Sequence, residues 1–179
     1  MKITSGSLQD VLVIEPRIVA DSRGFFLEAW NQQQFLQAGI EANFVQDIYS
    51  RSRQDVLRGL HYQIERPQGK LIWAVRGEVY DVVVDLRQSS PTFGRWMALN
   101  LSAENHRQVY VPPGMAHGFC TLSAEAELAY KCTDFYYPDF ERTIVWNDPQ
   151  LAISWPVGSP VLSDKDQQGL RFSDAPHFA

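Results

Sequence analysis

The sequence predicts an all-β protein, an antiparallel sandwich or barrel built from many short strands. Apolar and polar residues mostly alternate, which is the period of a strand, and these stretches are rich in Val, Phe, Tyr and Trp. Turn signals such as DSRG, RPQGK, SSPTFG and PPGMAHG separate the stretches. The connections are too short for the crossover helices of a parallel sheet. Strands are predicted at residues 12–14, 24–30, 44–50, 71–75, 78–86, 96–101, 108–111, 118–122 and 127–133.

Two short helices are predicted outside these strands. Asn31 can cap a helix over residues 32–38, which Gly39 can end. A further helical turn is expected at residues 163–168, within a proline-spaced polar segment. The chain has 179 residues and neither an internal repeat nor a low-complexity linker, so one domain is expected over residues 1–179, with a loosely held tail at about 173–179.

The composition excludes several classes of protein. Apolar residues make up 45% and charged residues 21%, which is globular rather than disordered. The net charge is −5 and there is no basic stripe, so no nucleic-acid partner is expected, although a local cluster of cations can still bind an anion. No apolar run approaches the roughly 18 residues of a membrane span, and the N-terminus lacks a signal peptide. Cys120 and Cys132 have no CxxC spacing, which favours a reducing cytoplasm.

One predicted strand, GEVYDVVVDLR, carries two acidic residues on an otherwise apolar face. Alternation places Val79, Asp81, Val83 and Asp85 on the same side. Either this face lines a wet cavity, or one aspartate pairs with a buried cation. An exposed outer face is also open for Asp85, near the strand end. For Asp81, between two valines, the cavity is favoured.

The stretch VLRGLHYQIERPQGK combines one histidine with cations in a strand-like run. Taken alone, His61 is more often a packed, hydrogen-bonded side chain than a catalyst, by roughly two to one. Arg58 and Lys70 change this balance, because clustered cations on an apolar strand are costly unless an anion binds among them. Arginine suits a phosphate through its planar fork, whereas lysine acts as a point charge.

A second histidine, His117, lies in YVPPGMAHGF, where a turn delivers it to the start of a strand. This resembles the second motif of the cupin superfamily, whose histidine is often a metal ligand. A metal-binding cupin also needs an HxH pair and a glutamate in its first motif, where this chain has LHYQ. One histidine from each motif is short of the three or more ligands that hold a metal tightly. The prediction is therefore a jelly roll without a metal.

Two further stretches carry candidate residues. ELAYKCTDFYYPDFERTI groups Tyr130 and Tyr136 with Glu141. A tyrosine that faces a cavity is usually a wall residue, but its phenol can also deliver a proton. In PVLSDKDQQGLRF, Lys165 and Asp166 crowd a short turn, which is also consistent with a solvated, capped helix end.

The motifs DSRGFFLEAW, VLRGLHYQ, QGKLIWAVRGEVYDVVVDLR, SPTFGRW, YVPPGMAHGF, AYKCTDFYYP and LSDKD occur in this order over about residues 1–172. Together they strongly resemble the dTDP-4-dehydrorhamnose 3,5-epimerases, and RGLHYQ paired with VPxGxAHGF is highly specific. The resemblance implies a cupin-like double-stranded β-helix (jelly roll) with short peripheral helices, acting as a homodimer without metal or cofactor. It implies conversion of dTDP-4-dehydro-6-deoxy-D-glucose to dTDP-4-dehydro-L-rhamnose, in dTDP-L-rhamnose biosynthesis.

The resemblance also implies roles for individual residues. His61 matches the general base and Asp166 the carboxylate that orients it. Tyr130 matches the acid on the opposite face of the sugar, and Lys70 the cation near the enolate oxygen. Asp81 falls where the family has an active-site carboxylate. The matching substrate contacts, some of them from the partner subunit, are Arg23, Glu28, Gln46, Arg58, Lys70, His117, Glu141 and Lys165.

One stretch departs from the family pattern, because QDIYSRS stands where the family commonly has QDNHSRS. Ile48 replaces an asparagine amide, and the loss of one such hydrogen bond costs about 0.5–1.5 kcal/mol. Tyr49 replaces a histidine. Three alternatives stay open: a mono-epimerase acting at C3 or C5 of another dTDP-deoxysugar, a non-catalytic jelly roll that binds a nucleotide sugar, and a metal-dependent cupin enzyme.

Overall fold

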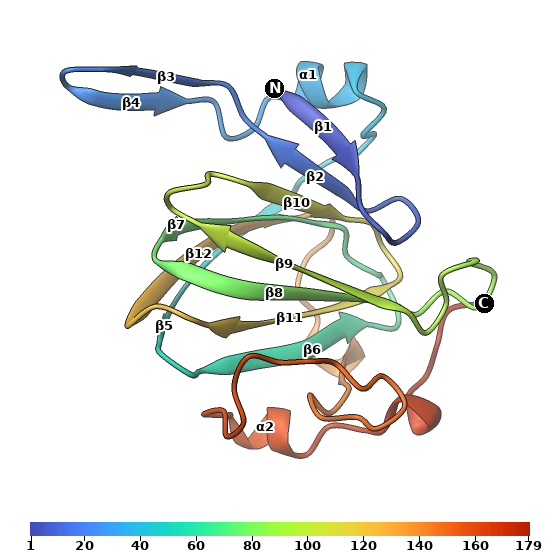
Figure 1. Ribbon diagram of the computed structural model, residues 1–179. Helices are drawn as coiled ribbons and strands as arrows, with labels where there is room; N and C mark the ends of the chain where they lie inside the picture. Colours follow the sequence, from blue (N-terminus) through green and yellow to red (C-terminus); the bar gives the residue numbers. More distant parts are fainter.

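The computed structural model describes residues 1–179, which form mostly β-strands (Figure 1). The strands are β1 (Lys2–Ser5), β2 (Leu12–Glu15), β3 (Ile18–Asp21), β4 (Gly24–Leu27), β5 (Gln46–Arg53), β6 (Leu57–Gln63), β7 (Lys70–Arg76), β8 (Glu78–Asp85), β9 (Trp96–Ser102), β10 (Gln108–Val111), β11 (Met115–Thr121), β12 (Glu125–Cys132) and β13 (Glu141–Thr143). The helices are α1 (Gln32–Gln37), α2 (Asp164–Gln167) and the short 3-10 turns η1 (Pro138–Phe140) and η2 (Phe172–Asp174). None of the helices is long and apolar enough to cross a membrane.

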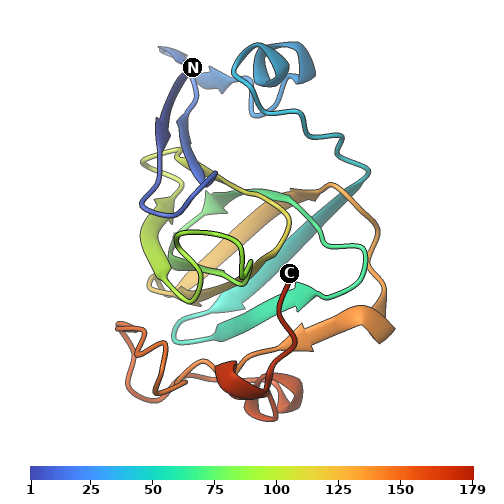
Figure 2. The same cartoon turned by 90° about the vertical axis from the view of Figure 1, so that its right-hand side faces the viewer.

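The strands form two antiparallel sheets that face each other (Figures 1 and 2). One has the order β1-β2-β10-β7-β12-β5 and the other the order β13-β6-β11-β8-β9. The main core cluster draws on both sheets, for example Ile72 and Leu128 from the first and Val83 and Phe119 from the second. Two antiparallel sheets packed in this way form a jelly roll, so the predicted all-β class is confirmed.

Strand β8 is buried on both faces, which explains its almost continuous apolar sequence. Val79 and Val83 point into the core between the sheets. Val82 and Val84 point the other way, into a second cluster built with the C-terminal part of the chain. A single alternating strand therefore contributes to two cores.

Every predicted element overlaps an observed one, but four of the observed strands were not predicted. Helix α1 has its N-cap where expected, since Asn31 Oδ1 accepts a hydrogen bond from Gln34 N at 3.2 Å. Ser163 caps α2 in the same way. The additional strands are β1, β3, β6 and β13. Three of them are only three or four residues long, too short for alternation to be recognised.

The β3–β4 hairpin projects away from the two sheets (Figure 1). Its exposed apolar side chains include Val19, Phe25 and Phe26, with 54%, 59% and 72% of their surface accessible. Apolar side chains this large are seldom left in water by a protein that acts alone. The hairpin is therefore a candidate interface.

The C-terminal strap, residues 161–178, runs back across the second sheet, next to β6 (Figures 1 and 2). Isolated bridges join Val161 to Val56, Leu170 to Ile144 and Phe178 to Arg87. Phe178 N donates to Leu86 O at 3.0 Å, and Ala175 is buried. This packing differs from the loosely held tail expected at about 173–179, because the tail completes the apolar cluster outside β8.

Asp85 is completely buried rather than exposed at the strand end. Its carboxylate accepts hydrogen bonds from Arg87 Nε and Nη2, both at 3.0 Å, and from the hydroxyls of Ser90 and Thr92. Burial alone would raise the pKa of the Asp85 carboxyl, but these hydrogen bonds outweigh it and hold the pKa below its usual value. Pairing with a cation, one of the alternatives left open, is therefore what the structure shows.

We predict that Asp85→Asn destabilises the fold by about 2–3 kcal/mol at neutral pH, because Arg87 loses its buried partner. The folded-state pKa of Asp85 lies below its unfolded value. Its stabilising effect is therefore present above about pH 4 and is lost as the pH falls through the folded-state pKa. Urea unfolding of both proteins across this range measures the difference. Asp10→Asn, which removes the exposed partner of the same arginine, should cost only about 0–1 kcal/mol. Equal losses in the two variants would contradict the prediction.

Candidate active site

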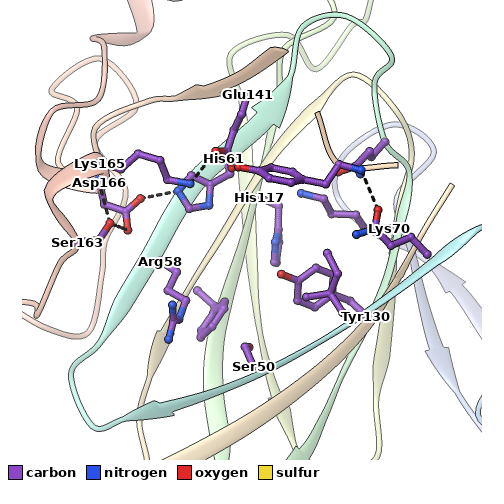
Figure 3. A pocket seen from close by; sticks show the side chains of 15 residues that line it. Ser50, Arg58, His61, Lys70, His117, Tyr130, Glu141, Ser163, Lys165 and Asp166 are labelled. Carbon is purple, nitrogen blue, oxygen red and sulfur yellow. Dashed lines mark hydrogen bonds and ion pairs between the residues drawn. The ribbon is translucent and has the colours of Figure 1, made fainter. Parts of the chain in front are cut away.

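A cavity of about 390 Å³ opens between the two sheets and reaches helix α2 (Figure 3). Its walls come mainly from β5, β6, β7, β11 and β12. Nine of the residues predicted from the sequence line it: Gln46, Arg58, His61, Lys70, His117, Tyr130, Glu141, Lys165 and Asp166.

The two sheets bring different chemistry to this cavity. His61 on β6 is directly opposite His117 on β11, so both imidazoles belong to one sheet. Tyr130 on β12 and Lys70 on β7 belong to the other, where Tyr130 lies opposite Ile48 on β5. A group bound in the cavity would therefore have imidazoles on one side and a phenol and an amine on the other.

Glycines allow β6 and β11 to approach closely next to the two histidines. Gly59 has a φ of +127°, which strongly favours glycine, and a Cβ there would lie 2.5 Å from Gly118 Cα. The ladder is irregular between His117 and Phe119 at the same place. These contacts account for the glycines in RGLHYQ and AHGF.

His61 and Asp166 form a close pair (Figure 3). The distance from His61 Nε2 to Asp166 Oδ1 is 2.5 Å, although 105 positions separate the two residues. Asp166 Oδ2 accepts a hydrogen bond from Ser163 Oγ at 2.8 Å. Burial acts to raise the pKa of Asp166, but the hydrogen bonds from His61 and Ser163 and the nearby positive charge of Lys165 together outweigh it, so the pKa is lowered and the group stays a carboxylate. An anion at Nε2 leaves Nδ1 as the nitrogen able to take a proton.

His117 has its own buried carboxylate, Asp81. The distance from His117 Nε2 to Asp81 Oδ2 is 2.8 Å, and Asp81 is completely buried. Its other oxygen, Oδ1, has no hydrogen-bond partner. The alternation of β8 had suggested that Asp81 lines the cavity. It does not line the cavity, and its carboxylate lies behind His117 instead.

Burial shifts the pKa values of the two groups on the opposite sheet. It lowers the pKa of the Lys70 ammonium, and it raises the pKa of the Tyr130 phenol to about 12. Tyr130 therefore keeps its proton at any physiological pH, while Lys70 sits in a position where positive charge needs a partner.

The cations at the cavity are only partly neutralised. Lys165 Nζ donates to Glu141 Oε2 at 2.8 Å, and Tyr136 Oη donates to the same oxygen at 2.9 Å. Arg58 Nε donates to Ser52 Oγ at 3.0 Å, but neither Arg58 nor Lys70 takes part in an ion pair. The free positive charge makes this cavity suitable for an anion.

Arg23 and Glu28, two of the predicted substrate contacts, lie outside the cavity. Arg23 is on the β3–β4 hairpin, where its guanidinium pairs with Asp21. Glu28 follows the hairpin and accepts hydrogen bonds from Asn31 and Gln34. A single chain does not bring these two residues to the site.

Two more lining residues, Ile48 and Tyr136, were discussed from the sequence without a role in the site. Four were not discussed at all: Ser50, Gln68, Phe119 and Ser163. Alternation could have found Ser50, which follows Gln46 and Ile48 on the same face of β5. Ser50 Oγ is buried without a hydrogen-bond partner, which is typical of an atom awaiting a ligand. No group of three or more His, Cys, Asp or Glu is arranged to hold a metal ion.

Comparison with known proteins agrees with this geometry. The family model for dTDP-4-dehydrorhamnose 3,5-epimerase matches residues 5–174. The dTDP-4-dehydrorhamnose 3,5-epimerase of Pseudomonas aeruginosa is 56% identical over 180 residues, covering 99% of both chains. The chain belongs to the dTDP-4-dehydrorhamnose 3,5-epimerase family. It is thus an isomerase with the cupin-like jelly roll of that family, as the sequence predicted.

Solved structures of the family share this fold closely. The dTDP-6-deoxy-D-glucose-3,5-epimerase of Legionella pneumophila Philadelphia 1, in complex with dTDP-4-keto-L-rhamnose, superposes with a TM-score of 0.93 at 49% identity, covering 96% of this chain and 93% of that one. The chain is also similar to the dTDP-4-dehydrorhamnose 3-epimerase of Streptomyces niveus, which is 40% identical over 177 residues, covering 98% of this chain and 86% of that protein.

Proposed function

We propose that this protein epimerises dTDP-4-dehydro-6-deoxy-D-glucose at both C3 and C5, giving dTDP-4-dehydro-L-rhamnose for dTDP-L-rhamnose biosynthesis. The observation that carries the proposal is the placement of His61 and Tyr130 on opposite sheets, facing one cavity. Inversion of a carbon centre needs proton removal on one face and delivery on the other. Two different groups across the ring meet this need.

In the proposed reaction His61 is the general base. The Asp166 carboxylate orients the imidazole and stabilises the imidazolium that forms when His61 takes the proton. C3 and C5 both flank the C4 carbonyl of the substrate. Removal of a proton from either carbon therefore gives an enolate with its charge on the same oxygen, O4.

Lys70 and Tyr130 complete the reaction from the other sheet. One cation near O4 stabilises both enolates, and preorganised charge of this kind is usually the largest catalytic contribution. The pKa of about 12 for Tyr130 keeps its proton in place until an enolate carbon takes it. This scheme assigns all of the acid–base chemistry to the protein's own side chains.

The nucleotide diphosphate would lie among the cations of the cavity. Arg58 offers a planar fork without an acidic partner, and Lys165 offers an ammonium that Glu141 holds in place.

We also propose that the reaction takes place in a reducing cytoplasm, because both cysteines are free and buried.

A homodimer would bring Arg23 and Glu28 to the site of a second copy. The hairpin that carries Arg23 extends from the body and exposes Phe25 and Phe26, so it is shaped to pack on another chain. This proposal accounts for two residues that match the substrate contacts of the family and yet lie outside the cavity of their own chain.

Solvent exchange tests for the proposed enolates. In D2O, the purified protein should place deuterium at both C3 and C5 of the ketosugar, because each centre passes through an enolate. Proton NMR measures both positions and identifies the product sugar. Exchange at C3 alone would reduce the function to a mono-epimerase, and binding without any exchange would indicate a non-catalytic nucleotide-sugar protein.

Two variants separate the base from the acid. His61→Ala should abolish exchange at both carbons, since no other group takes the proton. Tyr130→Phe should lower turnover more than exchange, because it removes delivery and leaves abstraction intact. Full turnover in Tyr130→Phe would show that another group is the acid.

The pH profile tests the role of Lys70. Because burial lowers the pKa of Lys70 from its ordinary value of 10.5, the ammonium is present at low pH and loses its proton before the pH reaches 10.5. As the pH is raised, kcat/KM should therefore begin to fall at a pH below 10.5. Tyr130, with a pKa of about 12, cannot produce this limb. The residual activity of Tyr130→Phe should keep the limb, and Lys70→Gln should lose it. The opposite pattern would assign the limb to the tyrosine.

The dimer is tested by Phe26→Ser, which replaces the most exposed aromatic side chain of the hairpin. We expect dissociation to monomers in light scattering and a higher KM, because the second chain no longer supplies Arg23. Val161→Ser, at an exposed apolar position away from the hairpin, is the control and should remain a dimer. A monomeric wild type with full activity would refute the dimer.

A further inference from the structure

The close contact between His61 and Asp166 depends on a segment that has little structure of its own. Helix α2 is a single turn, and the backbone of the strap that carries it pairs with the rest of the chain only at isolated bridges. A carboxylate on such a segment must be held from outside, because a displacement of about 1 Å in an active site can cost roughly 100-fold in rate.

Asp148 is a buried carboxylate that makes no ion pair and is not part of the cavity. Its Oδ1 accepts from the backbone N–H groups of Gln150 at 2.9 Å and Leu151 at 3.0 Å. Its Oδ2 accepts from Phe172 N at 2.8 Å. One side chain therefore joins the loop after β13 to the strap, six positions after Asp166. A buried charge is costly, and three backbone donors are what compensate it here.

The strap is attached a second time next to Gly169, through backbone hydrogen bonds. Leu170 N donates to Thr143 O at 2.8 Å, and Val145 N donates to Leu170 O at 2.9 Å. Thr143 is the residue opposite His61 in the β13–β6 ladder, so this row of the sheet runs directly from His61 to the strap. A Cβ at Gly169 would lie 2.9 Å from Val145 N, closer than real Cβ atoms approach.

We propose that Asp148 and Gly169 are positioning residues, which set the distance between Asp166 and His61. Asp148 fixes the strap beyond Asp166, and Gly169 lets the strap lie flat against β13. The inference rests on the proposed function only in its kinetic part, because the geometry of the His61–Asp166 pair exists without substrate.

Two variants disturb the Asp148 hydrogen bonds and the packing at Gly169 independently. Asp148→Asn keeps the shape of the side chain but turns one acceptor into a donor that faces backbone N–H groups. Gly169→Ala pushes the strap off β13 without changing any side chain of the cavity. In both variants kcat should fall roughly 10-fold to 100-fold.

The matched control is Leu151→Ala. Leu151 lies in the loop that carries Asp148, and its buried side chain belongs to the same apolar cluster as Phe172. The substitution removes this side chain, while the backbone N–H still donates to Asp148. Its melting temperature should fall at least as far as that of Asp148→Asn, yet its kcat should stay within about twofold of wild type.

A spectroscopic measurement separates positioning from stability. A short hydrogen bond between an imidazole and a carboxylate gives a strongly downfield proton signal in NMR, which Asp166→Asn would assign. The signal should persist in Leu151→Ala and be lost or shifted upfield in Asp148→Asn and Gly169→Ala. If both variants keep the signal, or if the control loses kcat equally, the positioning role is refuted. If the wild type shows the signal but does not epimerise, the proposed function fails and the positioning stands.

Discussion

The hydrogen bond between His61 and Asp166 is the interaction on which the rest of the site depends. It joins a strand in the middle of one sheet to a one-turn helix near the end of the chain, across 105 positions. A buried carboxylate is stable only with partners, and here they are the imidazole and the hydroxyl of Ser163. Much of the C-terminal part of the chain is arranged to bring these groups together.

The same site also contains features that do not favour stability. Lys70 is half-buried without a counter-ion, and Ser50 Oγ and Asp81 Oδ1 are buried without hydrogen-bond partners. Outside the site, buried Asp85 is compensated by Arg87, whereas four other buried polar atoms also lack a hydrogen-bond partner: Trp30 Nε1, Gln108 Oε1, Thr121 Oγ1 and His177 Nε2. Lys70 and Ser50 line the cavity, and polar groups left without partners at such a place are typical of a site that keeps its interactions for a ligand.

Much of the fold was predictable because its signals are local. Alternation located β8, and Asn31 marked the start of α1. The pattern could not show that β8 would be covered on both faces, so the burial of Asp85 was left open. Nor could it bring Asp166 to His61, since no local rule links residues so far apart. Their proximity was expected only through resemblance to the family. The same resemblance implied that some substrate contacts come from a partner subunit, but it did not single out Arg23.

The unpaired Arg58 has a consequence for the sugars while they are bound. In the proposed reaction it would bind the diphosphate, a part of the molecule that is identical in substrate and product. Binding energy of this kind stabilises both bound sugars equally. The equilibrium between the two bound sugars would then be close to the equilibrium in solution, which no enzyme can change. Net flow of material towards the product would therefore depend on a later reaction that removes it.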